Sequence, residues 1–145
     1  QGAEILMVAV LKGSVLFTAD LARAVRSPVL VDFMRVASYG AGTCTSGRIE
    51  IRKDLEMDIA GKDVLIVEDI IDSGLTLDAL RQSLAARHPA SLKICTLIDK
   101  KARREVSVPV DYVGFSLDDG FIVGYGLDLD ERYRDLPDIH LVEMN

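Results

Sequence analysis

Residues 64–77 have the sequence VLIVEDIIDSGLTL, and the order of residue types in this stretch decides the fold. The first four residues are apolar and mostly β-branched, which is typical of a buried strand in a parallel sheet. Two acidic residues, Glu68 and Asp69, follow at the predicted carboxyl end of this strand. Apolar residues at helical spacing then begin with Leu77. A strand, a short polar loop and a helix in this order predict an open α/β sheet, which binds its ligands outside the carboxyl ends of the strands.

The polar loop, residues 72–76, has the groups that bind a phosphate. Ser73 and Thr76 offer hydroxyls, and Gly74 lets backbone N–H groups approach an oxyanion at the positive end of the following helix. Asp72 could act as a general base, and the two acids before the loop could hold sugar hydroxyls or a divalent cation. Each residue alone is more simply explained as a helix cap or a solvated acid. Together they indicate a ribose 5-phosphate ligand.

The stretch from Val67 to Thr76 closely resembles the phosphoribosyl pyrophosphate signature of the type I phosphoribosyltransferases, in the form found in the hypoxanthine-guanine branch. The resemblance implies a mostly parallel sheet flanked by helices, with a small C-terminal hood, as a single domain over residues 1–145. It implies that Asp72 is catalytic, and that Glu68 and Asp69 bind the ribose directly or through Mg²⁺. The residues implied to bind the 5′-phosphate are Asp72, Ser73, Gly74, Leu75 and Thr76.

A second strand–loop–helix unit lies near the start of the chain. Residues 5–11 are apolar and predict a strand, and a helix is expected from about residue 15 to residue 25. Between them lie Lys12 and Gly13, which could bind an anion, although a turn glycine beside a solvated lysine is the simpler explanation. By resemblance this turn is the pyrophosphate-binding loop of the family, where the peptide bond before the lysine is commonly cis.

Residues 29–39 and 48–53 predict two strands joined by a segment rich in glycine and small polar residues. The second strand alternates apolar and charged residues, as expected of a half-exposed antiparallel strand. The resemblance implies that the joining segment closes over the reaction centre, with Ser38 and Tyr39 at its start. A plain surface hairpin is the alternative.

The last third of the chain has a second set of candidate residues. A buried strand over residues 92–98 is followed by Lys100, which by resemblance contacts the 6-oxo group of a purine. The family also has a Phe-Val-Val-Gly-Tyr segment followed by an Asp and an Arg-Asp-Leu motif, which residues 121–136 resemble. Mapped onto this chain, the motif assigns purine stacking to Phe121, purine-edge recognition to the backbone of Ile122, purine and Mg²⁺ binding to Asp128, and pyrophosphate binding to Arg134. Without the family, a core phenylalanine is the ordinary expectation for Phe121.

Composition limits the function further. The chain has 145 residues, 49% of them hydrophobic, and a net charge of −6. This is the size of one domain, and the acidic balance argues against a nucleic-acid-binding surface. No apolar run approaches the ~20 residues of a membrane span. Cys44 and Cys95 have no metal-ligand spacing, which favours a reducing compartment such as the cytoplasm.

We therefore expect a purine-salvage enzyme that transfers a phosphoribosyl group from phosphoribosyl pyrophosphate to hypoxanthine or guanine, with Mg²⁺ as cofactor. The family implies a homodimer or homotetramer. The alternatives are a xanthine-preferring enzyme, or a nucleic-acid-binding regulator with the same fold. Relative to the family, an N-terminal hood segment is expected to be missing, and residues 26–28 form a shorter connection than usual.

Overall fold

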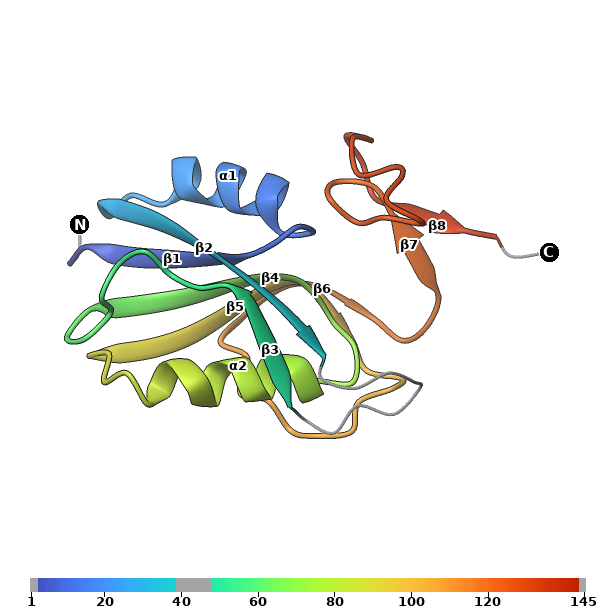
Figure 1. The fold of residues 1–145 in the computed structure, drawn as a ribbon. Coiled ribbons are helices and arrows are strands. Elements are labelled where there is room, and N and C mark those ends of the chain that lie inside the picture. Colours follow the sequence, from blue (N-terminus) through green and yellow to red (C-terminus); the bar gives the residue numbers. More distant parts are fainter. Residues whose placement is uncertain (1–2, 39–47, 144–145) are drawn as a thin grey trace.

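The computed structural model describes residues 3–38 and 48–143, so Tyr39 and Cys44 lie outside the described residues. Six strands form one sheet in the order β3-β2-β1-β4-β5-β6, and two more form a separate ribbon (Figure 1). Neighbouring strands of the sheet are parallel, except that β3 is antiparallel to β2. The strands are β1 (Ile5–Val10), β2 (Val29–Ser38), β3 (Ile49–Lys53), β4 (Asp63–Ile71), β5 (Ser91–Lys100), β6 (Tyr112–Leu117), β7 (Phe121–Val123) and β8 (His140–Val142).

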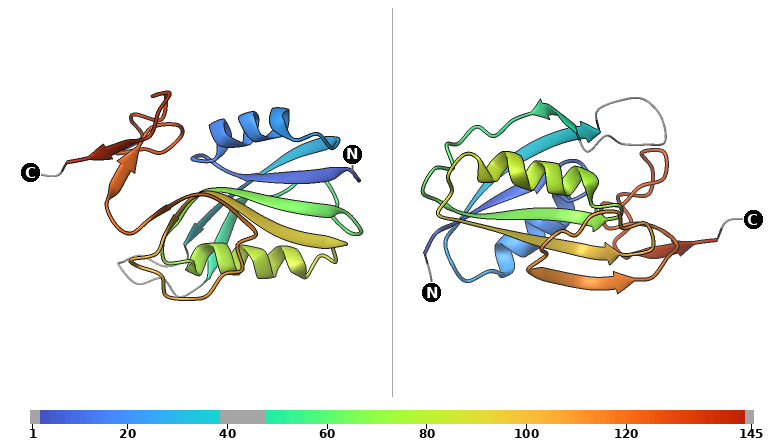
Figure 2. Two further views of the ribbon diagram at one scale, coloured as in Figure 1. Left: turned by 180° about the vertical axis from the view of Figure 1, so that it is seen from behind. Right: turned by 90° about the horizontal axis from the view of Figure 1, so that it is seen from below.

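Two helices cover opposite faces of the sheet, as expected (Figures 1 and 2). Helix α1 is Val15–Ala24, and helix α2 is Leu75–Ala85. The predicted apolar face of α2 is buried in the main core with Leu6, Val8, Ile66 and Ile94 of the central strands. In contrast, Thr18 is the only fully buried residue of α1. The best-packed part of the molecule is therefore the layer between α2 and the sheet. Neither helix is long and apolar enough to cross a membrane.

The central strand β4 is longer than the sequence suggested. Glu68 and Asp69 were expected to follow the strand, but they lie within it, because parallel pairing with β5 continues to Ile71 opposite Asp99. Successive side chains of a strand point to opposite faces of the sheet. The two carboxylates therefore lie in different environments, although they are adjacent in sequence.

Helix α2 ends earlier than predicted. We expected it to continue to about His88, but its last residue is Ala85. The N–H groups of Arg87 and His88 donate to the carbonyls of Leu84 and Ala85 at 3.0 and 3.2 Å, three residues back, which forms a tighter final turn. His88, which follows this final turn, has a positive φ of 63°, so the chain has left the right-handed helical conformation before the proline that was expected to end the helix.

The C-terminal hood is the ribbon of β7 and β8 with the loop between them. It lies beyond the carboxyl ends of the parallel strands (Figure 1). The strands pair antiparallel, with Ile122 opposite Leu141. Leu97 and Ile98 of β5 pack with Ile122 and Leu127 in a second apolar cluster, which attaches the hood to the sheet.

Candidate active site

Three segments that are distant in sequence meet at Gly13. A Cβ atom at Gly13 would lie 1.8 Å from Oδ2 of Asp69, and a Cβ at Gly126 would lie 2.3 Å from the carbonyl oxygen of Gly13. Only glycines allow approaches this close. The β1–α1 loop is therefore in contact with β4 on one side and with the hood loop on the other. The expected cis bond between Leu11 and Lys12 is present in this loop.

A pocket of about 460 Å³ opens at this edge of the sheet. Its walls come from the end of β4, the end of β5 and the hood, so it is the place where a parallel sheet is expected to bind a ligand. Six residues predicted from the sequence line it: Asp69, Asp72, Lys100, Phe121, Ile122 and Asp128. Five others complete the wall: Ile70, Arg103, Asp119, Gly120 and Leu127. Glu68 is not among the lining residues.

Asp72 is the carboxylate best placed to act on a ligand. Its Oδ1 is buried, yet it accepts no hydrogen bond from any described residue. A buried carboxylate oxygen without a partner is costly, and this one belongs to a wall of the pocket. We expect the missing donor to come from a bound molecule.

The loop predicted to bind the phosphate, residues 72–76 and called the phosphate loop below, connects β4 to the start of α2. Gly74 has a φ of +86°, and a Cβ there would lie 3.1 Å from side-chain carbons of Arg104 and Val108. The Ser73 hydroxyl accepts a hydrogen bond from the Leu75 N–H at 3.2 Å. The Thr76 hydroxyl lies 3.1 Å from the hydroxyl of Ser38, at the end of β2. The structure thus places the start of the predicted closing segment directly beside the phosphate loop.

Arg104 holds the backbone of this loop, and the sequence analysis did not identify its role. Its Nε donates to the carbonyl of Asp72 at 2.9 Å, and its guanidinium also bonds the carboxylate of Asp99 and, at 3.3 Å, the carbonyl of Lys100. The next N–H, of Glu105, donates to the carbonyl of Ser73 at 2.9 Å. The connection after β5 therefore fixes the phosphate loop and the predicted purine lysine in one arrangement.

The side of the pocket that is predicted to bind a purine combines a cation and an aromatic ring. Lys100 is the last residue of β5, and its side chain is 10% exposed. Its Nζ lies 4.0 Å from a carboxylate oxygen of Asp119, and no described residue is nearer as an ionic partner. Phe121 is 37% exposed, which leaves part of its ring available for a flat ligand.

The acidic pair on β4 favours a bound cation. Burial raises the pKa of Glu68, and the negative charge of Asp69 raises that pKa further. A divalent cation bound at Asp69 would offset the negative charge that Glu68 experiences, and Mg²⁺ prefers one or two carboxylates together with ligand phosphates. Asp69 and Asp128 fit this preference, because they line the same pocket. Within residues 3–38 and 48–143, no three His, Cys, Asp or Glu side chains converge as a ready-made metal cluster.

The two predicted pyrophosphate cations share one carboxylate, that of Glu131. Lys12 Nζ lies 2.8 Å from Oε1 of Glu131, and an Arg134 nitrogen lies 3.1 Å from Oε2. The hydrogen bond from Lys12, followed by that from Arg134, lowers the pKa of Glu131. Arg134 also donates to the carbonyl of Gly126 at 2.7 Å. Sequence analysis missed Glu131, because Lys12 and Glu131 are 119 positions apart.

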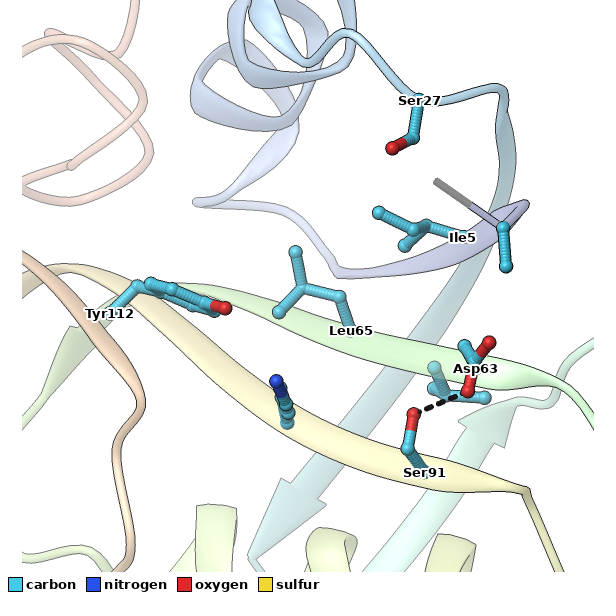
Figure 3. A pocket seen from close by; sticks show the side chains of 9 residues that line it. Ile5, Ser27, Asp63, Leu65, Ser91 and Tyr112 are labelled. Carbon is cyan, nitrogen blue, oxygen red and sulfur yellow. Dashed lines mark hydrogen bonds between the residues drawn. The ribbon is translucent and has the colours of Figure 1, made fainter. Parts of the chain in front are cut away.

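A second pocket, of about 310 Å³, lies at the opposite end of the sheet (Figure 3). It is lined by Ile5, Leu65 and Tyr112, and the Ser91 hydroxyl there donates to Asp63 at 2.7 Å. It contains none of the predicted site residues, and this pair of polar groups is already satisfied. The pocket at the carboxyl ends is therefore the candidate active site.

Comparison with known proteins shows the family of the chain. The family model described as the phosphoribosyl transferase domain matches residues 1–130. The hypoxanthine phosphoribosyltransferase of Salmonella typhimurium is 58% identical over 137 residues, which are 94% of this chain and 77% of that protein. A crystal structure of a hypoxanthine-guanine phosphoribosyltransferase from Bacillus anthracis superimposes with a TM-score of 0.93 at 50% identity, covering 99% of this chain and 84% of that one. A hypoxanthine phosphoribosyltransferase from Trypanosoma cruzi has a TM-score of 0.92 at 44% identity, covering 97% of this chain and 74% of that one.

Proposed function

The chain belongs to the phosphoribosyl transferase domain family, and we propose that it is a purine-salvage enzyme that acts on hypoxanthine or guanine. It transfers the 5-phosphoribosyl group of phosphoribosyl pyrophosphate to the base, giving IMP or GMP and pyrophosphate. The observation that carries this proposal is the single pocket that contains Asp72, Lys100 and Phe121. An acceptor for a base proton, a donor for a 6-oxo group and an aromatic face together match a 6-oxopurine.

The reaction forms the bond from N9 of the purine to C1 of the ribose as the bond from C1 to the pyrophosphate oxygen breaks. Asp72 accepts the proton of the base at N7, or a hydrogen bond from it, as electron density moves toward C1. The unpartnered Oδ1 of Asp72 supplies the acceptor. The leaving pyrophosphate keeps the electron pair of the broken bond. Catalysis is then mainly positioning and charge stabilisation.

The remaining residues hold the sugar donor at its two ends. Ser73, Gly74, Leu75 and Thr76 bind the 5′-phosphate at the start of α2, while Lys12, the Gly13 backbone and Arg134 bind the pyrophosphate. Glu68 and Asp69 hold the ribose hydroxyls. When bound, Mg²⁺ supplies positive charge beside the leaving group, and Asp69 and Asp128 of the pocket would hold it, with Glu68, which does not line the pocket, as the third expected ligand. The expectation that the segment beginning with Ser38 and Tyr39 excludes water concerns residues outside the described ranges apart from Ser38, whose hydroxyl lies 3.1 Å from that of Thr76.

Two further assignments belong to this proposal. We place the enzyme in the cytoplasm, because its two cysteines, Cys44 and Cys95, favour a reducing compartment. We also expect a homodimer or homotetramer, and the T. cruzi relative was studied for its oligomeric state. Xanthine also has a 6-oxo group, so Lys100 alone does not separate it from hypoxanthine and guanine.

The test is a spectrophotometric assay of hypoxanthine, guanine, xanthine and adenine with phosphoribosyl pyrophosphate and Mg²⁺. The host should lack its own enzyme, and an Asp72→Asn variant purified in the same way controls for contamination. We expect hypoxanthine or guanine to be converted to the 5′-monophosphate, adenine to be inert, and the variant to be nearly inactive. Preference for xanthine would reassign the substrate. Failure with all four bases, combined with a salt-sensitive nucleic-acid complex, would favour the regulator.

A further inference from the structure

Glu131 forms ion pairs with both cations that are assigned to pyrophosphate binding. Lys12 and Arg134 are the two cations assigned to pyrophosphate, and both already contact the two oxygens of the same carboxylate, at 2.8 and 3.1 Å. A carboxylate that bridges two cations through separate oxygens takes the same charge-assisted contacts that two oxygens of a phosphate group would take. In the described structure the two cations assigned to pyrophosphate are therefore paired with a side chain of the protein itself.

The position of Glu131 is fixed by its backbone as well as by its ion pairs. Glu131 and the preceding Asp130 have φ values of +66° and +55°, which are uncommon for residues other than glycine. The N–H of Glu131 donates to a carboxylate oxygen of Asp128 at 2.8 Å. The side chain of Glu131 remains 61% exposed, so it can leave the cations without disturbing a core. A strained but anchored backbone with an exposed side chain is the arrangement expected of a displaceable group.

We propose that Glu131 is an internal counter-ion that occupies the pyrophosphate cations of the unliganded enzyme and is displaced when pyrophosphate or the sugar donor binds. This inference rests on the proposed function, because it takes the anion to be pyrophosphate. Glu131 competes with the ligand for Lys12 and Arg134, so it weakens binding of free pyrophosphate and favours release of this product. It is a positioning residue and does not touch the reacting atoms.

The opposite role makes the opposite prediction. If Glu131 only held Lys12 and Arg134 in the correct orientation for the ligand, then removing its charge would weaken pyrophosphate binding. If Glu131 competes, removing its charge will strengthen binding. The sign of the change in affinity therefore separates the two roles.

The experiment is calorimetric titration of pyrophosphate with Mg²⁺, and separately of phosphoribosyl pyrophosphate with Mg²⁺, into the wild-type protein and Glu131→Gln. We expect Glu131→Gln to bind pyrophosphate about threefold to tenfold more tightly, since two partly exposed ion pairs no longer oppose the ligand. The steady-state inhibition constant of pyrophosphate as a product should fall by the same factor. Glu131→Asn, which tolerates the left-handed backbone better, should bind more tightly as well.

Glu4→Gln is the matched control, because it makes the same change in net charge at an exposed residue. Glu4 lies just before the start of β1, whereas Lys12 lies just after the end of that strand. Its affinity for pyrophosphate should equal that of the wild type. Equal or weaker binding by both Glu131 variants would overturn the inference, and so would an equal gain in Glu4→Gln. If the wild-type protein bound neither ligand and converted no base, the proposed function would fail and this inference with it. Binding by the wild type without a gain in the Glu131 variants would remove only the inference.

Discussion

The phosphate loop, residues 72–76, and the hood loop, residues 124–136, are assigned to opposite ends of one sugar donor, yet they are built differently. The phosphate loop connects the central strand to the best-packed helix, and Arg104 and Glu105 hold its carbonyls at 2.9 Å. The hood loop has four residues other than glycine with positive φ, and polar side chains make many of its contacts. The first is a fixed cradle, whereas in the second the backbone is hydrogen-bonded and only the exposed side-chain ion pairs can adapt to a ligand. The comparison suggests that chemistry is placed on the rigid side and ligand exchange on the adaptable side.

The largest effect is expected at the rigid side, for Asp72→Asn. The change removes the proton acceptor, so kcat should fall about 10²-fold to 10⁴-fold. Stability should be nearly unchanged, because the buried Oδ1 of Asp72 has no partner to lose among the described residues. Steady-state kinetics and thermal unfolding measure the two quantities. A kcat within fivefold of the wild type would show that Asp72 is not the base.

Breaking the support of the phosphate loop should reduce both activity and stability. Arg104→Met leaves the carboxylate of Asp99, 9% exposed, without its guanidinium partner, which costs about 3 kcal/mol for a buried pair. We expect a lower midpoint in urea unfolding and a kcat/KM for phosphoribosyl pyrophosphate reduced by about tenfold or more. Lys101→Met is the control, because its side chain is 67% exposed and lies 3.9 Å from the same aspartate. Equal effects of the two substitutions would argue against the clamp.

The buried carboxylate of Glu68 should destabilise the folded protein when it is ionised. Burial raises its pKa, so the folded protein binds this proton more tightly than the unfolded chain does. The carboxyl then costs no stability below its unfolded pKa, and costs progressively more as pH rises toward its folded pKa. Without Mg²⁺, Glu68→Gln should therefore raise the melting temperature above about pH 5, by about 2–4 °C for each kcal/mol relieved. An equal difference in melting temperature at pH 4 and pH 8 would contradict this cause.

The smallest effect is expected where the hood loop contacts α1. The hydroxyl of Tyr125 donates to the carboxylate of Asp20, and burial together with this bond raises the pKa of Tyr125 to about 12. Tyr125→Phe should raise the KM for phosphoribosyl pyrophosphate by about twofold to fivefold and change kcat less, because one hydrogen bond contributes about 1 kcal/mol. Asp20→Asn should return the tyrosine absorbance titration toward pH 10. A large loss of kcat in Tyr125→Phe would mean that the hood loop is more rigid than proposed.

The same contrast explains which parts of the site could be predicted from the sequence. The phosphate loop and its flanking strand and helix come from one contiguous stretch, so periodicity and turn chemistry were sufficient to predict them. The end of β4 was misplaced because Glu68 and Asp69 are polar, while the backbone pairing with β5 continues beyond them. Pairing between strands is a tertiary property, and charge in one strand does not reveal it.

The interactions that sequence analysis missed join distant positions. Arg104 is 32 residues from the carbonyl that it holds, Tyr125 is 105 residues from Asp20, and Glu131 is 119 residues from Lys12. No local pattern specifies such pairs, since each depends on how the β5–β6 connection or the hood folds back. The resemblance to the family named Arg134 and Asp128, but it did not indicate the carboxylate between the two cations.

The most direct test of the two-sided site is to separate the two ends of the sugar donor by calorimetry. IMP has the 5′-phosphate without pyrophosphate, and pyrophosphate has the other end alone. Thr76→Val should weaken the binding of IMP while leaving pyrophosphate almost unaffected, and Arg134→Gln should do the reverse. Both variants should weaken the binding of phosphoribosyl pyrophosphate. If each variant weakened IMP and pyrophosphate by similar factors, the assignment of the two loops to opposite ends of one ligand would be wrong.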